Sequence, residues 1–299
     1  MELRYGMFIM LSSLSLYADG FLDEQERGEE RSELVSPNPN IELGESSYQI
    51  AVSSQAPSNL PKEQKTTLHN FPQRVQIGGN YSYAHIKPKG NHSTKGSLGG
   101  VFAIYEYRPQ DSVYAAAAFS WRSGMTKHSA THRKIQDFNG QERVGYTFGK
   151  KRIGDNRLTL FTGVGVRYLN EKVRVHSASL EVAYTEFYVP LGFLFENKVN
   201  SIFSWGCNFQ WMPQVFPIVR LEPLNGAQWS LKYKLSNFLV EVPLTFNVYS
   251  DRLAIIVSPF FETWHDGRTT AKTKTGLKLG LPSNSYIFTG VNVSLGVSF

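Results

Sequence analysis

From Phe71 onward, apolar residues alternate with small or polar ones in one segment of the chain after another. In the last segment, 286–299, small or polar residues separate the members of an apolar row: Ile287, Val291, Val293, Leu295, Val297 and Phe299. A repeat of two residues predicts a β-strand with one apolar and one polar face. Counting such segments predicts about ten strands, with eight or twelve as the alternatives.

Short and long connections alternate between the predicted strands. The short ones are 108–111, 149–156, 196–200 and 249–251, and the long polar ones include 88–96, 122–134 and 265–285. No apolar run approaches the roughly 18 to 20 residues of a membrane-spanning helix. Alternating strands, in contrast, can present one face to lipid and the other to a lumen. The sequence therefore predicts an all-β fold over residues 71–299: a transmembrane, antiparallel up-and-down β-barrel with both termini on the side of the short turns.

The first 70 residues differ from the rest in composition and charge. Residues 1–18 combine Arg4, an apolar stretch and a small residue at Ala18, which predicts a signal peptide that is cleaved on export. Residues 19–70 are acidic and rich in Pro and Ser, and they cannot bury enough apolar surface to fold. We expect them to form a disordered periplasmic linker, and a plug inside the lumen is the alternative.

The end of the chain resembles the assembly signal of Gram-negative outer-membrane β-barrel proteins. That signal has a polar residue, a glycine, two apolar residues one position apart and a terminal aromatic residue, which here are Thr289, Gly290, Val293, Leu295 and Phe299. Two Val-Pro-Leu segments, 189–191 and 242–244, are also similar to segments of small outer-membrane barrels, and we expect their prolines near the barrel rim. The resemblance covers 71–299 and indicates no subfamily. It implies a location in the outer membrane and recognition by the barrel-assembly machinery.

Charged residues on the predicted strands indicate which face lines the lumen. A charge on the lipid face near the bilayer midplane costs about 2–4 kcal/mol for Arg and less for Glu, so strand charges are expected to point inward. The residues concerned are Glu106, Glu142, Arg157, Arg167, Glu186, Glu241 and Glu262. Because about ten strands enclose a narrow lumen, these side chains either fill it with salt bridges or line a narrow, selective channel.

Motifs of catalysis and metal binding are scarce. The sequence contains no HExxH, GxSxG or CxxC, and its single cysteine, Cys207, excludes a disulfide framework within the chain. His128 and His132 would have the spacing of metal ligands only if their loop were helical. We therefore expect no catalytic residues, no metal and no cofactor.

One combination of residues leaves an enzyme open as an alternative. His265 and Asp266, together with Glu262 or Asp137, could form a proton-transfer site at the outer rim of the barrel. Some outer-membrane barrels are rim hydrolases that cleave proteins or modify lipid A, so the alternative function is a hydrolase of that kind.

Basic residues gather in the predicted outer loops: Lys89, Lys95, Lys127, Arg133, Lys272 and Lys274. Such charges favour contact with the phosphates of lipopolysaccharide, and sulfated host glycans are the alternative ligands, which would make the protein an adhesin. The expected partners are outer-membrane lipid and lipopolysaccharide, and nucleic acid is not among them. The sequence as a whole predicts a non-enzymatic surface protein or a narrow porin-like channel.

Overall fold

In the computed structural model, the residues described are 71–90, 92–129, 131–149, 156–175, 178–221, 228–249, 252–269 and 280–299. In these ranges no helix is long and apolar enough to cross a membrane. The predicted signal peptide (1–18) and linker (19–70) lie outside the described residues, and so do Lys272 and Lys274.

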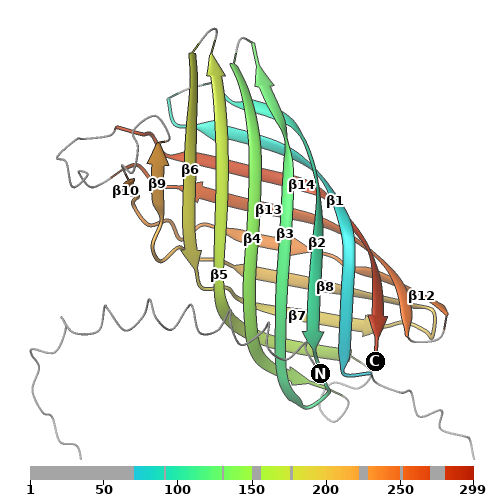
Figure 1. Ribbon diagram of the computed structural model, residues 1–299. Helices are drawn as coiled ribbons and strands as arrows, with labels where there is room; N and C mark the ends of the chain where they lie inside the picture. The colour runs from blue at the N-terminus through green and yellow to red at the C-terminus, as the bar shows by residue number, and fades with distance from the viewer. Residues whose placement is uncertain are drawn as a thin grey trace, which may run out of the picture. The chain divides into compact units, whose positions relative to one another are not determined.

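Within the described ranges, fourteen strands form one antiparallel sheet (Figure 1). The strands are β1 (Gln73–Pro88), β2 (Thr94–Tyr107), β3 (Ser112–His128), β4 (Thr131–Phe148), β5 (Asn156–Val175), β6 (Ala178–Tyr188), β7 (Leu191–Lys198), β8 (Phe203–Trp211), β9 (Ile218–Leu221), β10 (Gln228–Ser230), β11 (Phe238–Glu241), β12 (Leu244–Tyr249), β13 (Leu253–Asp266) and β14 (Asn284–Ser298). Strands β1 to β5 pair in chain order, and β1 also pairs with β14, which closes the sheet on itself.

Several short strands are successive pieces of one barrel strand. The β5 strand pairs with β6 through residues 165–175 and with β7 through residues 156–162, so β6 and β7 share one position in the wall. The next position in the wall is shared by β8, which pairs with β7, and β9, which pairs with β6. The position after that is shared by β10, which pairs with β9, and by β11 and β12, which both pair with β8. The result is a closed antiparallel barrel of ten strands, as the alternation predicted.

Prolines mark two of these interruptions. Val189-Pro190 separates β6 from β7, and Val242-Pro243 separates β11 from β12. Proline has no N–H to donate to a neighbouring strand. At the second break, Pro243 therefore only accepts a hydrogen bond, from Gly206 N at 2.8 Å. Its neighbour Val242 donates its N–H to Pro259 O at 3.0 Å. The expected rim position is wrong, because β7 continues for eight residues and β12 for six beyond the prolines.

The middle of the outward face of the barrel is mostly apolar, whereas the buried charged residues lie on the inward face. Exposed aliphatic residues form the middle of the outward face, among them Ile77 (64% exposed) and Leu295 (58%). Exposed aromatic residues flank them towards the chain termini (Tyr105, Tyr146, Trp205, Phe246) and towards the opposite end (Tyr83, Trp121, Tyr168, Phe261). An aliphatic band between two aromatic girdles around a charged interior is the surface of a barrel in lipid. The protein is therefore an integral outer-membrane β-barrel.

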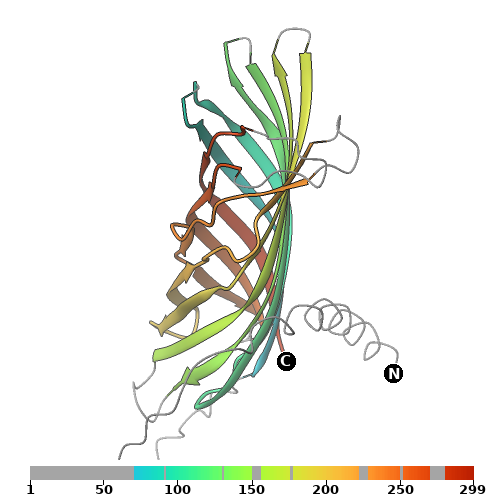
Figure 2. The same cartoon turned by 90° about the vertical axis from the view of Figure 1, so that its left-hand side faces the viewer.

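The strands extend into regions that the sequence predicted as loops. β3 continues to His128 and β4 begins at Thr131, so most of the predicted loop 122–134 is a β-hairpin. Figure 2 shows this green hairpin and the yellow-green β5–β6 hairpin rising above the β1–β2 hairpin at the end away from the C-terminus. A hairpin beyond the membrane has polar residues on both faces, so its sequence loses the two-residue alternation and resembles a loop.

Candidate functional site: the lumen and the basic outer face

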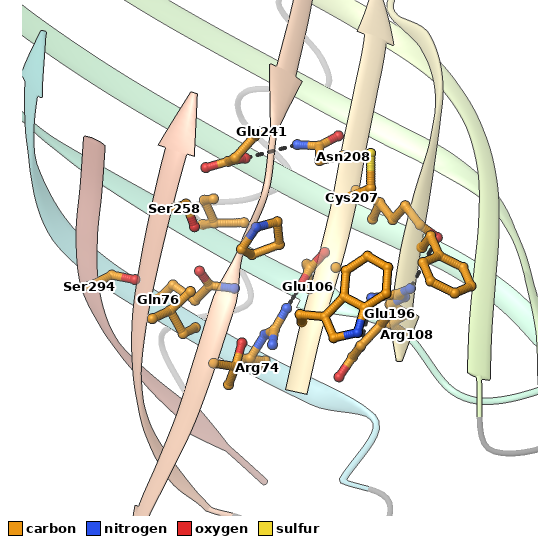
Figure 3. Close-up of a pocket in the computed structure, with 18 of the residues that line it drawn as sticks. Arg74, Gln76, Glu106, Arg108, Glu196, Cys207, Asn208, Glu241, Ser258 and Ser294 are labelled. Atoms are coloured by element: carbon orange, nitrogen blue, oxygen red, sulfur yellow. Dashed lines mark hydrogen bonds and ion pairs between the residues drawn. The ribbon is translucent and has the colours of Figure 1, made fainter. Parts of the chain in front are cut away.

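The part of the lumen nearest the chain termini is a cavity with charged side chains in its lining, and a second cavity continues it towards the termini. Arg74, Glu106, Arg108 and Glu196 line both. Figure 3 shows that these side chains project into the cavity from different strands. We call this space the terminal cavity.

Ion pairs hold the charged side chains of the terminal cavity in place. Arg74 Nη2 on β1 lies 2.6 Å from Glu106 Oε2 on β2, and Arg108 Nη1 after β2 lies 3.1 Å from Glu196 Oε2 on β7. Arg108 Nε also donates to Thr159 Oγ1 at 2.8 Å. Successive side chains of a strand point to opposite faces. Arg74 and Glu106 point into the lumen because the apolar rows of β1 and β2 occupy the outward face.

Further from the termini, a network of charges crosses the lumen. Arg122 on β3 lies 2.7 Å from Asp137 on β4 and 2.6 Å from Glu262 on β13. Arg167 on β5 lies 2.9 Å from Asp137 and 3.6 Å from Glu186. The planar guanidinium groups also stack on aromatic rings: Arg122 Cζ lies 3.7 Å from the centroid of the Phe288 ring, and Arg167 Cζ lies 4.5 Å from that of Trp264. We call this group the arginine layer.

An apolar cluster adjoins the arginine layer. Its buried members come from nearly every position around the wall: Ala84, Ile86, Leu98, Ile135, Leu169, Val182, Tyr184, Tyr188, Met212, Val219, Leu221, Trp229, Leu231, Phe260, Trp264, Tyr286 and Phe288. Trp229, Trp264, Tyr286 and Phe288 are at most 2% exposed. Among the described residues, large side chains therefore pack together inside this part of the lumen. The lumen is thus a cavity at the terminal end and a packed core beyond it.

A row of basic residues crosses five neighbouring strands on the outward face. In the register of the sheet, His85 lies opposite Lys95, Lys95 opposite Lys127, Lys127 opposite His132, and His132 opposite Arg174. All except the half-buried His85 are exposed. Like charges directly opposite each other destabilise a sheet. We call it the basic row.

The predicted lumen charges lie in different parts of this arrangement. Glu106 belongs to the terminal cavity, and Arg167, Glu186 and Glu262 belong to the arginine layer; all four are less than 9% exposed. Arg157 also lines the terminal cavity. Glu241 accepts hydrogen bonds from Asn208 Nδ2 (3.0 Å) and Asn292 Nδ2 (2.9 Å) in the same cavity.

Two predicted placements are wrong. Glu142 lies on the outward face of β4, opposite Ala117 and Val164, and its neighbour Arg143 points inward instead. Arg133 is not part of an exposed loop, because it lies on β4 with 11% of its side chain exposed and pairs with the buried Glu171 at 3.1 Å. Lys89 lies in the β1–β2 turn, and Lys95 and Lys127 lie on strands; all three are exposed.

The residues proposed for a rim hydrolase, His265 and Asp266 with Glu262 or Asp137, do not form one site. His265 lies on the outward side of β13, whereas Glu262 and Asp266 lie on its inward side and are buried. Asp137 and Glu262 are both bound to Arg122. His128 and His132 lie on neighbouring strands of a hairpin, and in the described part of the chain no three His, Cys, Asp or Glu residues cluster as metal ligands.

The residues of the assembly-signal resemblance lie on or next to β14. Val293, Leu295 and Phe299 face outward and are 48%, 58% and 53% exposed, and Gly290 lies on the inward side, opposite Ser82 of β1. Phe299 ends the ladder, since its N–H donates to Gln73 O at 3.0 Å and its carbonyl accepts from Gln73 N at 3.2 Å.

Sequence reasoning missed Arg74, Arg108, Arg122 and Arg143 as lumen residues. The parity of the alternation could have identified three of them, because Arg74 precedes Val75, Arg122 follows Trp121 and Arg143 precedes Val144. Each therefore lies on the face opposite an apolar row. Arg122 was hidden because residues 122–134 were assigned to a loop. Nothing in the sequence alone pairs it with Glu262, because that contact depends on the closure of the barrel.

No protein-family profile matches the chain, and no curated protein matches it. Solved structures with a similar fold include the outer membrane protease OmpT from Escherichia coli (11% identity, TM-score 0.47, 76% of this chain and 96% of that chain). They also include the translocator domain of autotransporter NalP from Neisseria meningitidis (12% identity, TM-score 0.42, 78% and 90%) and Ail, the attachment invasion locus protein of Yersinia pestis (11% identity, TM-score 0.32, 74% and 97%). These are outer-membrane barrels of varied function, and similarities this low assign no function to the chain.

Proposed function

We propose that the protein is a closed, non-enzymatic barrel of the outer membrane that binds phosphate groups of lipopolysaccharide through its basic row. The observation that carries this proposal is the register of Lys95 and Lys127, which lie directly opposite each other on the outward face of β2 and β3. Two exposed ammonium groups so placed repel each other unless an anion lies between them.

The position of the basic row supports a ligand on the outer side of the membrane. The row lies beyond the aromatic residues of the far girdle: His85 follows Tyr83 on β1, Lys127 follows Trp121 on β3, and Arg174 follows Tyr168 on β5. Barrels of this type have their short turns in the periplasm, so the end away from the termini faces outward. Lipopolysaccharide phosphates are the anions nearest to such a girdle.

The packed core supports a surface protein rather than a channel. The apolar cluster draws side chains from strands all around the wall, and the arginine layer beneath it is held by ion pairs of 2.6 to 3.6 Å. An open channel would require these groups to move apart and to leave buried charges unpaired, which is costly.

Binding of purified lipopolysaccharide to the detergent-refolded protein tests the proposal. Replacing Lys95 and Lys127 together by Glu should weaken binding and flatten its dependence on salt, because exposed charges act over about 8 Å at physiological ionic strength. The matched control is Arg220→Glu with Lys232→Glu, an equal change of charge at exposed positions on the opposite wall, which should leave binding unchanged.

Dephosphorylated lipopolysaccharide should bind the unaltered protein more weakly. Equal binding of the two forms, or equal binding by the Lys95/Lys127 variant, would contradict the proposal. If heparin binding alone depended on Lys95 and Lys127, the ligand would instead be a soluble sulfated glycan, as expected for an adhesin.

A further inference from the structure

Arg143 is a buried cation that forms no ion pair within 4 Å in the described part of the protein. It projects inward from β4, is 7% exposed, and lines both the terminal cavity and the adjoining space below the arginine layer. No described carboxylate lies within ion-pair distance of its guanidinium group, and its Nε has no hydrogen-bond partner there. Its nearest described ring is Phe161, whose centroid lies 5.3 Å from Cζ.

The carboxylates that share the cavity with Arg143 already have other partners. Glu106 is bound by Arg74 at 2.6 Å and Glu196 by Arg108 at 3.1 Å. Glu241 is held by the amides of Asn208 and Asn292, and Figure 3 shows the Glu241–Asn208 contact at the upper edge of the cavity. None of these groups is therefore available to neutralise Arg143 without breaking a contact.

Both basic and acidic side chains line the terminal cavity. Its described basic residues are Arg74, Arg108, Arg143, Arg157 and Lys198, and its described acidic residues are Glu106, Glu196 and Glu241. Low-dielectric walls focus the field of a buried cation such as Arg143 into the cavity, which favours anions there.

Among the described residues, the terminal cavity opens towards one end of the barrel. Phe71, Pro72 and Ser298, next to the two ends of the barrel sheet, line its outer part, whereas the packed core closes the opposite end. By the orientation rule used above, the open end faces the periplasm. A ligand would therefore come from the periplasm and leave the same way.

We propose that the terminal cavity binds a small anionic solute that carries a phosphate or carboxylate group, with Arg143 as its principal counter-ion. A guanidinium group offers a planar fork of N–H donors that fits either anion in a bidentate manner. Gln141, which lines the adjoining space and whose buried Oε1 has no hydrogen-bond partner among the described residues, presents an amide group to the uncharged part of the solute. This site is separate from the basic row, which lies on the outer face of the wall and at the other end of the barrel.

Calorimetric titration of the full chain, refolded in detergent, tests the site with inorganic phosphate and with citrate as separate probes. We expect saturable binding of at least one of them, and the stronger probe identifies the preferred anion. Arg143→Met should weaken that binding roughly tenfold to a hundredfold, since a hydrogen-bonded charge is lost. Arg220→Met, an exposed arginine on the outward face of β9, is the matched control and should leave the affinity unchanged.

Heat-modifiable gel mobility shows whether each variant has folded, and Arg143→Gln, which keeps a polar side chain, replaces Arg143→Met if the latter does not fold. Absence of saturable binding by both probes in the unaltered protein would overturn the proposal. It would also be overturned if a folded Arg143 variant bound the anion as tightly as the unaltered protein. Neither result depends on lipopolysaccharide binding, so the site and the proposed surface function fail independently.

Discussion

Arg122 on β3 and Glu262 on β13 form an ion pair of 2.6 Å although 140 residues separate them in the chain. Their strands are not neighbours, since β2, β1 and β14 lie between them in the wall, so the pair reaches across the lumen. The same guanidinium group binds Asp137 at 2.7 Å. A single side chain thus ties the two sides of the barrel together at the base of the packed core.

Arg122→Met should lower the free energy of unfolding by about 3–5 kcal/mol, because it leaves Glu262 buried without its cation. Urea titration of the protein in lipid vesicles measures this loss. Glu262→Gln should cost less, since a neutral amide needs no counter-ion. Arg174→Met, at an exposed position on β5, should change stability by no more than about 0.5 kcal/mol. A similarly small effect for Arg122→Met would mean that the ion pairs of the arginine layer do not stabilise the folded barrel.

Val257 and Ser258 are adjacent residues on opposite faces of β13. Val257 faces outward within the lipid band, whereas Ser258 is 4% exposed and lines the terminal cavity. Val257→Arg should cost up to about 2–4 kcal/mol on insertion into a bilayer. Ser258→Arg should cost less, because residue 258 points into the lumen and away from lipid. Heat-modifiable gel mobility compares the two, and equal damage would show that the assigned faces are wrong.

Glu142 is the exception to the apolar outward face. It lies on β4 between the aromatic residues Phe138 and Tyr146, opposite Ala117 and Val164, and the described residues offer it no ion pair. Glu142→Leu should therefore stabilise the protein in bilayers by about 1–2 kcal/mol. Glu181→Leu, in the β5–β6 hairpin, is the comparison and should lower stability slightly, because Glu181 accepts a hydrogen bond from Asn170 Nδ2 at 2.8 Å and lies 3.8 Å from Lys172. A loss of stability in Glu142→Leu would indicate that the carboxylate has a partner in the membrane.

The closing strand β14 pairs with β1 through 284–298 and with β13 through 284–297. Deleting Phe299 removes one hydrogen-bonded pair with Gln73, so the protein should still refold in detergent, although the resemblance to an assembly signal leads us to expect poor assembly in cells. Deleting 291–299 should abolish both refolding in detergent and assembly in cells. The barrel could then not close, and each unsatisfied backbone N–H or C=O group at an open strand edge in lipid costs several kcal/mol. Normal surface display of the longer deletion would contradict the closed barrel.

The two-residue alternation was enough to predict the barrel, its ten strands and the outward direction of rows such as Val291 to Val297. It could not predict the positions of the breaks at Pro190 and Pro243. A proline lacks the N–H that would donate to the neighbouring strand, but its carbonyl can still accept a hydrogen bond, so such a residue can lie in the middle of the wall as well as at the rim. It also failed for the hairpins beyond the membrane, where both faces are polar.

The candidate sites depend on register, which the sequence does not reveal. Lys95 and Lys127 could be recognised as basic residues, but their direct opposition follows only from the pairing of β2 with β3. Likewise, the rule that strand charges point inward holds for Glu106 and Arg167 and fails for Glu142. The rule rests on an energetic cost, and a single glutamate can bear that cost in a barrel that is stable overall.

The conductance of planar bilayers containing the purified protein tests the closed lumen most directly. The packed core and the arginine layer predict no stable conductance above that of the bare bilayer, at any voltage that the membrane withstands. Arg122→Met is informative in the same experiment, because loosening the arginine layer should give brief openings at most while the apolar cluster remains. A steady, ohmic conductance of the unaltered protein would contradict a closed barrel and indicate a channel.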